Sequence, residues 1–149
     1  MTEMNLLDAF ERVPVKIFRD PASGSQYAAD EIRKLIRAKA AEGKPCVLGL
    51  ATGSTPKSLY AELVRLHREE GLSFKNVITF NLDEYYPIEN DAFQSYKSYM
   101  HRMLFDHIDI EKENIHIPNG ALQKEEIKIH CLAYETKIEA VGGIDLQVL

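Results

Sequence analysis

The chain has 149 residues, of which 45% are hydrophobic and 28% charged, and its formal net charge is -5. This length and composition suffice for one domain with a packed core. The acidic balance argues against a nucleic-acid partner, because phosphate backbones select basic surfaces. No apolar run approaches the roughly 20 residues that span a bilayer, and the first ten residues lack the basic and apolar regions of a signal peptide. We therefore expect a soluble, cytoplasmic protein without a membrane partner.

Short β-rich runs alternate with longer helical ones along the first half of the chain. Residues 15–18 (VKIF) are a strand candidate, and apolar residues at helical spacing then predict a helix that runs up to Gly43. Residues 45–51 (PCVLGLA) are continuously apolar, as in a strand that is buried on both faces of a parallel sheet. A second helix is expected to open at Pro56, with three leucines on one side: Leu59, Leu63 and Leu66.

The alternation continues through the second half. Residues 76–82 (NVITFNL) are a third strand candidate, apolar spacing predicts a helix over 96–104, and residues 115–117 suit a short strand. The last helix is expected to place five residues on one stripe and to end at Gly142-Gly143: Ile127, Cys131, Tyr134, Ile138 and Val141. Residues 144–149 (IDLQVL) read as a core strand cut off at its carboxyl end, which predicts that the chain is part of a longer domain.

Strands that alternate with helices predict βαβ units, a parallel sheet and right-handed crossovers. We therefore expect a single α/β domain over residues 1–149, incomplete at its carboxyl end. In such sheets ligands bind beyond the carboxyl ends of the strands. This rule directs attention to the loops after Ala51 and Asn81.

The first of these loops is Thr52-Gly53-Ser54-Thr55. Gly53 lets the backbone approach a ligand closely, and its neighbours offer hydroxyls. With Thr55 as N-cap and Pro56 at the first helical position, free N–H groups lie at the positive end of the helix. These features predict an anion site for a phosphate monoester. The alternative is a capped helix start that binds nothing, and the GxxxxGK[ST] spacing of an ATP-binding loop is absent.

The second loop places Asp83 and Glu84 at the end of a buried strand, next to Tyr85 and Tyr86. A carboxylate in a partly desolvated cleft has a raised pKa that suits proton abstraction. Adjacent residues in an extended chain point opposite ways, so only one of the pair should face the cleft. The alternative is a solvated turn. Together the two loops favour an enzyme that holds a phosphorylated sugar and moves a carbon-bound proton.

Other reactive side chains show weaker patterns. Cys46 and Cys131 fall in apolar runs and form no CxxC, which predicts buried free thiols in a reducing compartment. His101 and His107 are six residues apart, which does not place them on one helix face, so we predict no metal site there even with Asp106 and Asp109 nearby.

Four stretches of the chain resemble the glucosamine-6-phosphate deaminase (isomerase) family: CVLGLATGSTP at 46–56, SFKNVITFNLDEYYPI at 73–88, QSYKSYMHRMLFDHIDI at 94–110, and the ENIHIPNG that follows. The NLDEYY element and its spacing from QSYxSYM are specific. The resemblance implies a Rossmann-like three-layer α/β sandwich with a mostly parallel sheet, truncated here before its last strands and helices. It also implies conversion of glucosamine 6-phosphate and water to fructose 6-phosphate and ammonia, without a metal or redox cofactor.

The resemblance assigns roles to individual residues. Asp83 matches the proton acceptor, which moves a proton from C2 to C1 of the open-chain amino sugar. Thr52, Gly53, Ser54 and Thr55 match the loop that contacts the phosphate, and Glu84 is assigned support only. In the family, a later loop supplies an Asp, a His that assists ring opening and a Glu, and a later Lys holds the phosphate. These are absent here, so we expect the 149-residue chain alone to be inactive and the full-length family member to be a homo-oligomer.

Three other interpretations compete with this one. A related 6-phosphogluconolactonase would hydrolyse a sugar lactone, but that family tends to place a basic residue where Tyr85 follows Asp83-Glu84. Another amino-sugar phosphate, such as galactosamine 6-phosphate, could be the substrate. A non-catalytic sugar-phosphate sensor would lose the proton acceptor and usually carry a DNA-binding segment, whereas Asp83 is present and no helix-turn-helix precedes Val15.

Overall fold

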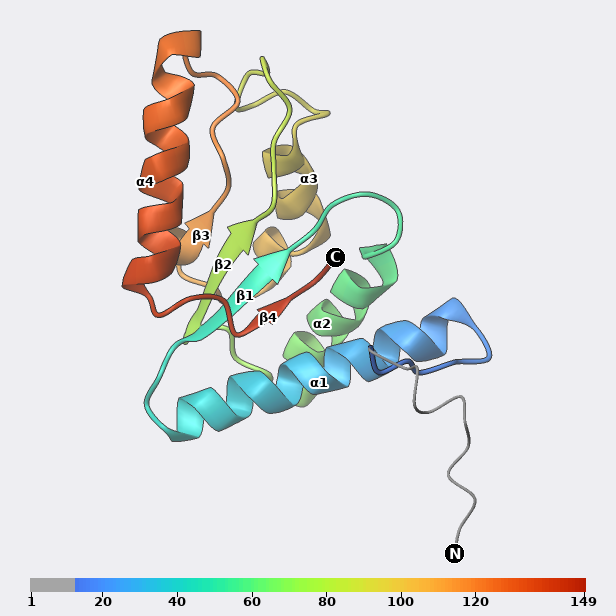
Figure 1. Ribbon diagram of the computed structural model, residues 1–149. Helices are drawn as coiled ribbons and strands as arrows, with labels where there is room; N and C mark the ends of the chain where they lie inside the picture. The colour runs from blue at the N-terminus through green and yellow to red at the C-terminus, as the bar shows by residue number, and fades with distance from the viewer. Residues whose placement is uncertain (1–12) are drawn as a thin grey trace, which may run out of the picture.

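A parallel sheet of four strands organises residues 13–149, the part of the chain that the computed structural model describes (Figure 1). Two predictions concern residues outside or mainly outside this range: that the first ten residues form no signal peptide, and that no helix-turn-helix precedes Val15. The strands are β1 (Cys46–Leu50), β2 (Val77–Asn81), β3 (Ile115–His116) and β4 (Leu146–Gln147). The α-helices are α1 (Pro21–Ala41), α2 (Lys57–Glu70), α3 (Tyr96–Met103) and α4 (Ile127–Ala140), and short 3-10 turns are η1 (Phe105–His107), η2 (Lys112–Asn114) and η3 (Lys124–Glu126).

The strands lie in the order β3-β2-β1-β4, and every pairing is parallel. β1 pairs with β2 over its whole length, from Cys46 to Leu50. Since β4 pairs with its other edge, β1 is central, and all five of its residues are buried. This confirms the strand expected from the continuous apolar run.

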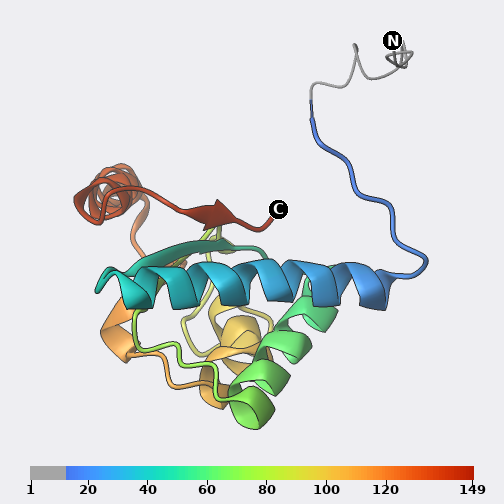
Figure 2. The same ribbon diagram turned by 90° about the horizontal axis from the view of Figure 1, so that it is seen from below.

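Helices α1, α2 and α3 lie on one side of the sheet, and α4 lies on the other (Figures 1 and 2). The three leucines that the helical spacing predicts on one side of the second helix are confirmed as buried on the first side: Leu59, Leu63 and Leu66. Ile32 and Ile36 of α1 are buried with them. They form one cluster with every second residue of β1, namely Cys46, Leu48 and Leu50. The arrangement is a three-layer α/β/α sandwich, as expected.

The second face of the sheet is covered less completely. Phe80 stacks on His116 with ring centroids 4.6 Å apart, and Tyr134 of α4 meets the Phe80 ring edge-on at 5.6 Å. The Tyr134 hydroxyl lies 2.9 Å from the carbonyl oxygen of Asn81 and 3.0 Å from that of His116, so it joins the ends of β2 and β3. No residue of α4 is fully buried.

Two predictions about the strands and the buried side chains were wrong. Residues 15–18 form no strand, because no neighbouring strand pairs with them, and Val15 and Ile17 are exposed. Cys131 is exposed rather than buried, because α4 turns mainly Tyr134 toward the sheet, whereas Cys46 is buried as expected. Both thiols are free.

The predicted boundaries of the last helix and the last strand agree more closely with the structure. Gly142 and Gly143, with φ values of 90° and 89°, follow α4 where the sequence predicts its end. The strand predicted over 144–149 is present but pairs only at Leu146 and Gln147. No helix within residues 13–149 combines the length and apolar character needed to cross a bilayer.

Candidate functional site

The two loops singled out by the sequence leave the same edge of the sheet. β1 and β2 run parallel with Leu50 opposite Asn81, and the N–H of Leu82 donates to the carbonyl oxygen of Leu50 at 3.2 Å. Because the strands end side by side, residues 52–55 and 82–86 begin next to each other (Figure 1). This is the edge at which parallel α/β sheets bind ligands.

The loop after β1 is open to solvent and leads into an uncapped helix. Gly53 has φ of 102°, a left-handed conformation that favours glycine, and Ser54 and Thr55 are exposed. The prediction that Thr55 caps the helix was wrong by one residue. The N–H of Tyr60 donates the first helical hydrogen bond to the carbonyl oxygen of Pro56 at 2.9 Å, so Pro56 occupies the cap position, and no side chain caps α2. The positive end of the helix dipole, formed by the N–H groups of the first turn, therefore faces the loop.

Two tyrosine hydroxyls hold the backbone of this loop. Tyr60 of α2 donates to the carbonyl oxygen of Ala51, and Tyr99 of α3 donates to that of Gly53 at 2.6 Å. Burial raises the pKa of both hydroxyls, so both remain donors at neutral pH. The sequence predicted only that Tyr99 lies in the helix over 96–104. A tyrosine rather than a phenylalanine on an apolar stripe was the available signal, because a buried hydroxyl needs a partner.

The two carboxylates of the second loop have different surroundings. Glu84 accepts hydrogen bonds from the backbone N–H groups of Tyr96 at 2.8 Å and Lys97 at 2.9 Å, so it caps the first turn of α3. Asp83 is exposed and makes no hydrogen bond or ion pair with another residue in the range 13–149. A partly desolvated cleft around Asp83 was expected, and the described residues do not form one, because none of them covers this side chain.

Asn81, at the end of β2, was not identified from the sequence. Its side chain is buried, and its amide N–H donates to the carbonyl oxygen of Leu50 at 3.4 Å. The side-chain oxygen has no partner among the described residues. A buried polar atom without a partner is unfavourable by about 1–3 kcal/mol, and such atoms are rare in folded proteins; within residues 13–149 the only other such side-chain atom is the hydroxyl oxygen of Thr79 in the same strand.

Two cavities lie near these elements. One of about 300 Å³ includes Thr55 together with Ser25 and Ser58, whose hydroxyl oxygens are 2.6 Å apart. The other, of about 480 Å³, lies between α3 and β3 and includes none of the predicted site residues. Within residues 13–149 no group of three or more His, Cys, Asp or Glu side chains is arranged to hold a metal, and Nδ1 of His101 lies 2.8 Å from a carboxylate oxygen of Asp106.

Residues 19–149 match the family described as glucosamine-6-phosphate isomerases/6-phosphogluconolactonase. The chain belongs to this family. A glucosamine-6-phosphate deaminase-like protein of Bacteroides thetaiotaomicron is 45% identical over 147 residues, which are 99% of this chain and 22% of that protein. The glucosamine-6-phosphate deaminase of Porphyromonas gingivalis is 50% identical over 123 residues, which are 82% of this chain and 46% of that enzyme.

Solved structures of the family agree with the fold. A monomeric glucosamine-6-phosphate deaminase superimposes with a TM-score of 0.84 at 38% identity, covering 91% of this chain and 54% of that one. A 6-phosphogluconolactonase of Thermotoga maritima superimposes with a TM-score of 0.69 at 21% identity, which shows the fold alone; it covers 89% of this chain and 56% of that one. The chain thus spans about half the length, or less, of these family members.

Proposed function

We propose that this chain supplies the phosphate-binding loop and the proton acceptor of a glucosamine-6-phosphate deaminase. The reaction converts glucosamine 6-phosphate and water to fructose 6-phosphate and ammonia. The observation that carries the proposal is the register of β1 with β2, in which Leu50 lies opposite Asn81. An anion-binding loop and an unpaired carboxylate then lie at adjacent strand ends, within reach of the two ends of one sugar phosphate.

In this proposal the open N-terminus of α2 and the backbone at Gly53 bind the phosphate group. Asp83 removes the proton from C2 of the open-chain amino sugar and returns it at C1. The resulting ketimine is hydrolysed by water, which releases ammonia. Because Asp83 has no partner within the described chain, its carboxylate is available to accept a proton.

The deaminase is favoured over the lactonase by the relatives. The proteins that are 45% and 50% identical to this chain are named for the deaminase, whereas the lactonase neighbour shares 21% identity. Tyr85, which stands where the lactonase pattern tends to carry a basic residue, packs its ring on Tyr96 of α3 with centroids 4.5 Å apart. This contact gives the aromatic side chain of Tyr85 a packing partner on α3.

We further propose that residues 1–149 belong to one domain of this kind and that its small-molecule partner is a sugar phosphate, with no nucleic-acid or membrane partner. The free thiols of Cys46 and Cys131 support a reducing compartment, hence the cytoplasm. Self-association of the full-length protein stays a prediction that sedimentation analysis can test, and the solved relative with a TM-score of 0.84 is described as monomeric.

Turnover is tested by fusing this chain to the part of the Porphyromonas gingivalis deaminase that follows the matched segment. We expect the fusion to release ammonia from glucosamine 6-phosphate and not to hydrolyse 6-phosphogluconolactone. Asp83→Asn should lower kcat by about 10²–10⁴-fold with little change in substrate binding, because the amide cannot accept the proton.

The matched control is Asp91→Asn, which changes an exposed aspartate of the next loop in the same way. It should leave kcat unchanged. Turnover of the Asp83→Asn fusion at the native rate would refute the role of Asp83. Ammonia release by the 149-residue chain alone would refute the expectation that this chain lacks part of the active site.

A further inference from the structure

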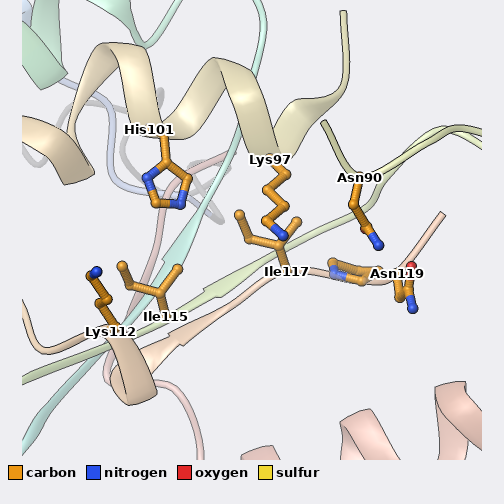
Figure 3. Close-up of a pocket in the computed structure, with 8 residues that line it drawn as sticks. Asn90, Lys97, His101, Lys112, Ile115, Ile117 and Asn119 are labelled. Carbon is orange, nitrogen blue, oxygen red and sulfur yellow. The ribbon is translucent and has the colours of Figure 1, made fainter. Parts of the chain in front are cut away.

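A cavity of about 480 Å³ opens between α3 and the strand β3, at the outer edge of the sheet (Figure 3). Lys97 and His101 reach into it from α3. Lys112 of η2 and Ile115 and Ile117 of the β3 segment form the opposite side. The elements α3 and η2 therefore bring two ammonium groups to one concave surface. We propose that this cavity is a second anion-binding site, for a small phosphate monoester.

The charge of the cavity is the first argument. The whole chain carries a net charge of -5, but no Asp or Glu lines this cavity. Lys97 and Lys112 form no ion pair with a residue in the range 13–149, whereas Lys34, Lys39 and Lys44 each lie within 3 Å of a carboxylate oxygen. Other described lysines, such as Lys124 and Lys128, also form none, so Lys97 and Lys112 are distinguished by lining the same cavity. Two unneutralised ammonium groups around one cavity attract an anion, and lysine is a common phosphate ligand.

The size and the remaining walls are the second argument. Pockets for small ligands occupy about 300–1,000 Å³ and combine apolar walls with a few polar groups. Here Ile115 and Ile117 provide an apolar wall for a carbon skeleton. The side-chain oxygen of Asn119 accepts a hydrogen bond from the N–H of Ala121 at 3.0 Å, so the end of Asn119 left for a ligand is its amide donor. A phosphate oxygen accepts from such a donor.

This site is separate from the proposed active site, although the two share a helix. None of the residues that line the cavity belongs to the loop at 52–55 or to the Asp83-Glu84 pair. Lys97 and His101 lie on α3, whose Tyr99 holds the carbonyl oxygen of Gly53. The inference does not depend on the deaminase proposal, because it rests only on residues of the cavity.

Nuclear magnetic resonance of the ¹⁵N-labelled chain tests the proposal by titration with inorganic phosphate and with glucose 6-phosphate. We expect saturable shifts of amide signals near Lys97 and Lys112, and no such shifts with neutral glucose. The double variant Lys97→Gln/Lys112→Gln should weaken binding in the cavity by at least about tenfold, because both charged contacts are lost. Signals of Gly53 and Ser54 should respond to phosphate as in the native chain.

The matched control is Lys124→Gln/Lys128→Gln, which removes two exposed lysines that do not line the cavity. It should bind phosphate in the cavity as the native chain does. The proposal is overturned if the native chain shows no saturable shift near Lys97 and Lys112, if glucose produces the same shifts, or if both double variants weaken binding equally. Failure at Gly53 alone would count against the deaminase proposal and leave this one standing.

Discussion

Hydrogen bonds from single side-chain atoms hold the backbone of the loop at the candidate active site. Tyr99 differs from phenylalanine by one hydroxyl, and that hydroxyl lies 2.6 Å from the carbonyl oxygen of Gly53. The bond connects α3 to a loop that α3 does not adjoin in sequence. The orientation of the Gly53 backbone is therefore set in part by a residue 46 positions away.

We predict that Tyr99→Phe weakens the binding of glucosamine 6-phosphate about 3–10-fold. The loss of one hydrogen bond should lower the free energy of unfolding by only about 0.5–1.5 kcal/mol. Isothermal titration calorimetry and urea unfolding measure the two effects. Tyr27→Phe, which removes a hydroxyl bonded to Lys16 on the surface, should leave binding unchanged. Equal binding by both variants would contradict a role for Tyr99 in the loop.

His116 makes the stability of the protein sensitive to mild acid. Burial against Phe80, with a smaller effect of Lys137, holds the pKa of the His116 imidazole below its usual 6.5. The unfolded chain therefore binds a proton at a higher pH than the folded chain, and stability present above about pH 6.5 is lost as the pH falls through the folded pKa.

We predict that the urea midpoint of the native protein falls between pH 7.5 and pH 5.5 and that His116→Phe reduces this fall. Phenylalanine keeps the aromatic stack on Phe80 and has no proton to gain. His107→Phe, on the other side of the sheet, provides a comparison of another histidine. The same pH dependence in His116→Phe and in the native protein would refute the assignment to His116.

At the scale of elements, α3 depends on a carboxylate from outside the helix. With 8 residues it is shorter than the roughly 12–15 residues at which isolated helices become even marginally stable. Ser95 accepts a hydrogen bond from the N–H of Ser98 at 3.0 Å, and Glu84 accepts from the N–H groups of Tyr96 and Lys97. The negative charge also complements the positive end of the helix.

We predict that Glu84→Ala lowers the free energy of unfolding by about 1–2 kcal/mol, as the loss of a helix cap does. Because α3 carries Tyr99, the variant should also weaken phosphate binding at the loop. Chemical denaturation with Glu89→Ala as an exposed control measures the first effect. A loss no larger than that of Glu89→Ala would mean that Glu84 does not stabilise α3.

At the scale of the whole molecule, an ion pair connects the first helix with the segment that leads into the last strand. Nζ of Lys39, near the end of α1, lies 2.5 Å from a carboxylate oxygen of Asp145, just before β4. The other oxygen of Asp145 accepts from the N–H of Val47 in β1 at 2.9 Å. Partial burial opposes ionisation of Asp145, but the bonds from Lys39 and Val47 outweigh it and hold its pKa below the usual 3.8.

We predict that Asp145→Asn lowers the free energy of unfolding at pH 7 by about 1–2 kcal/mol, since a charged hydrogen bond is lost. For the native protein, the stability due to the lowered pKa is present above about pH 4 and disappears as the pH falls further. Thermal unfolding from pH 7 to pH 3 should therefore show a smaller decline for Asp145→Asn than for the native protein. Parallel declines would contradict this role of Asp145.

Much of the fold could be predicted because its signals are local. The apolar run of β1 and the leucine spacing of α2 depend on neighbouring residues alone. Lys39 stands at a position where the helical spacing of α1 favours an apolar residue. Its ion pair with Asp145 explains the lysine, and this pair is visible only in the tertiary structure. Cys131 was misplaced because helical spacing cannot tell how much of α4 the sheet covers. A Cβ at Gly49 would lie 2.0 Å from the end of the Gln147 side chain, so a larger residue there would displace this side chain, and no local pattern indicates this contact.

The sequence by itself determined where β1 to β4 and α1 to α4 lie along the chain, the two loops after β1 and β2 and, through specific motifs, the family, although it also predicted a strand at 15–18 that is absent. Only the tertiary structure decided that Glu84 caps α3, that Tyr99 holds Gly53, and that Lys97 and Lys112 share a cavity. The physical reason is the distance along the chain over which each interaction acts. Periodicity and turn chemistry act over a few residues, whereas these contacts join segments whose proximity follows from how the layers pack.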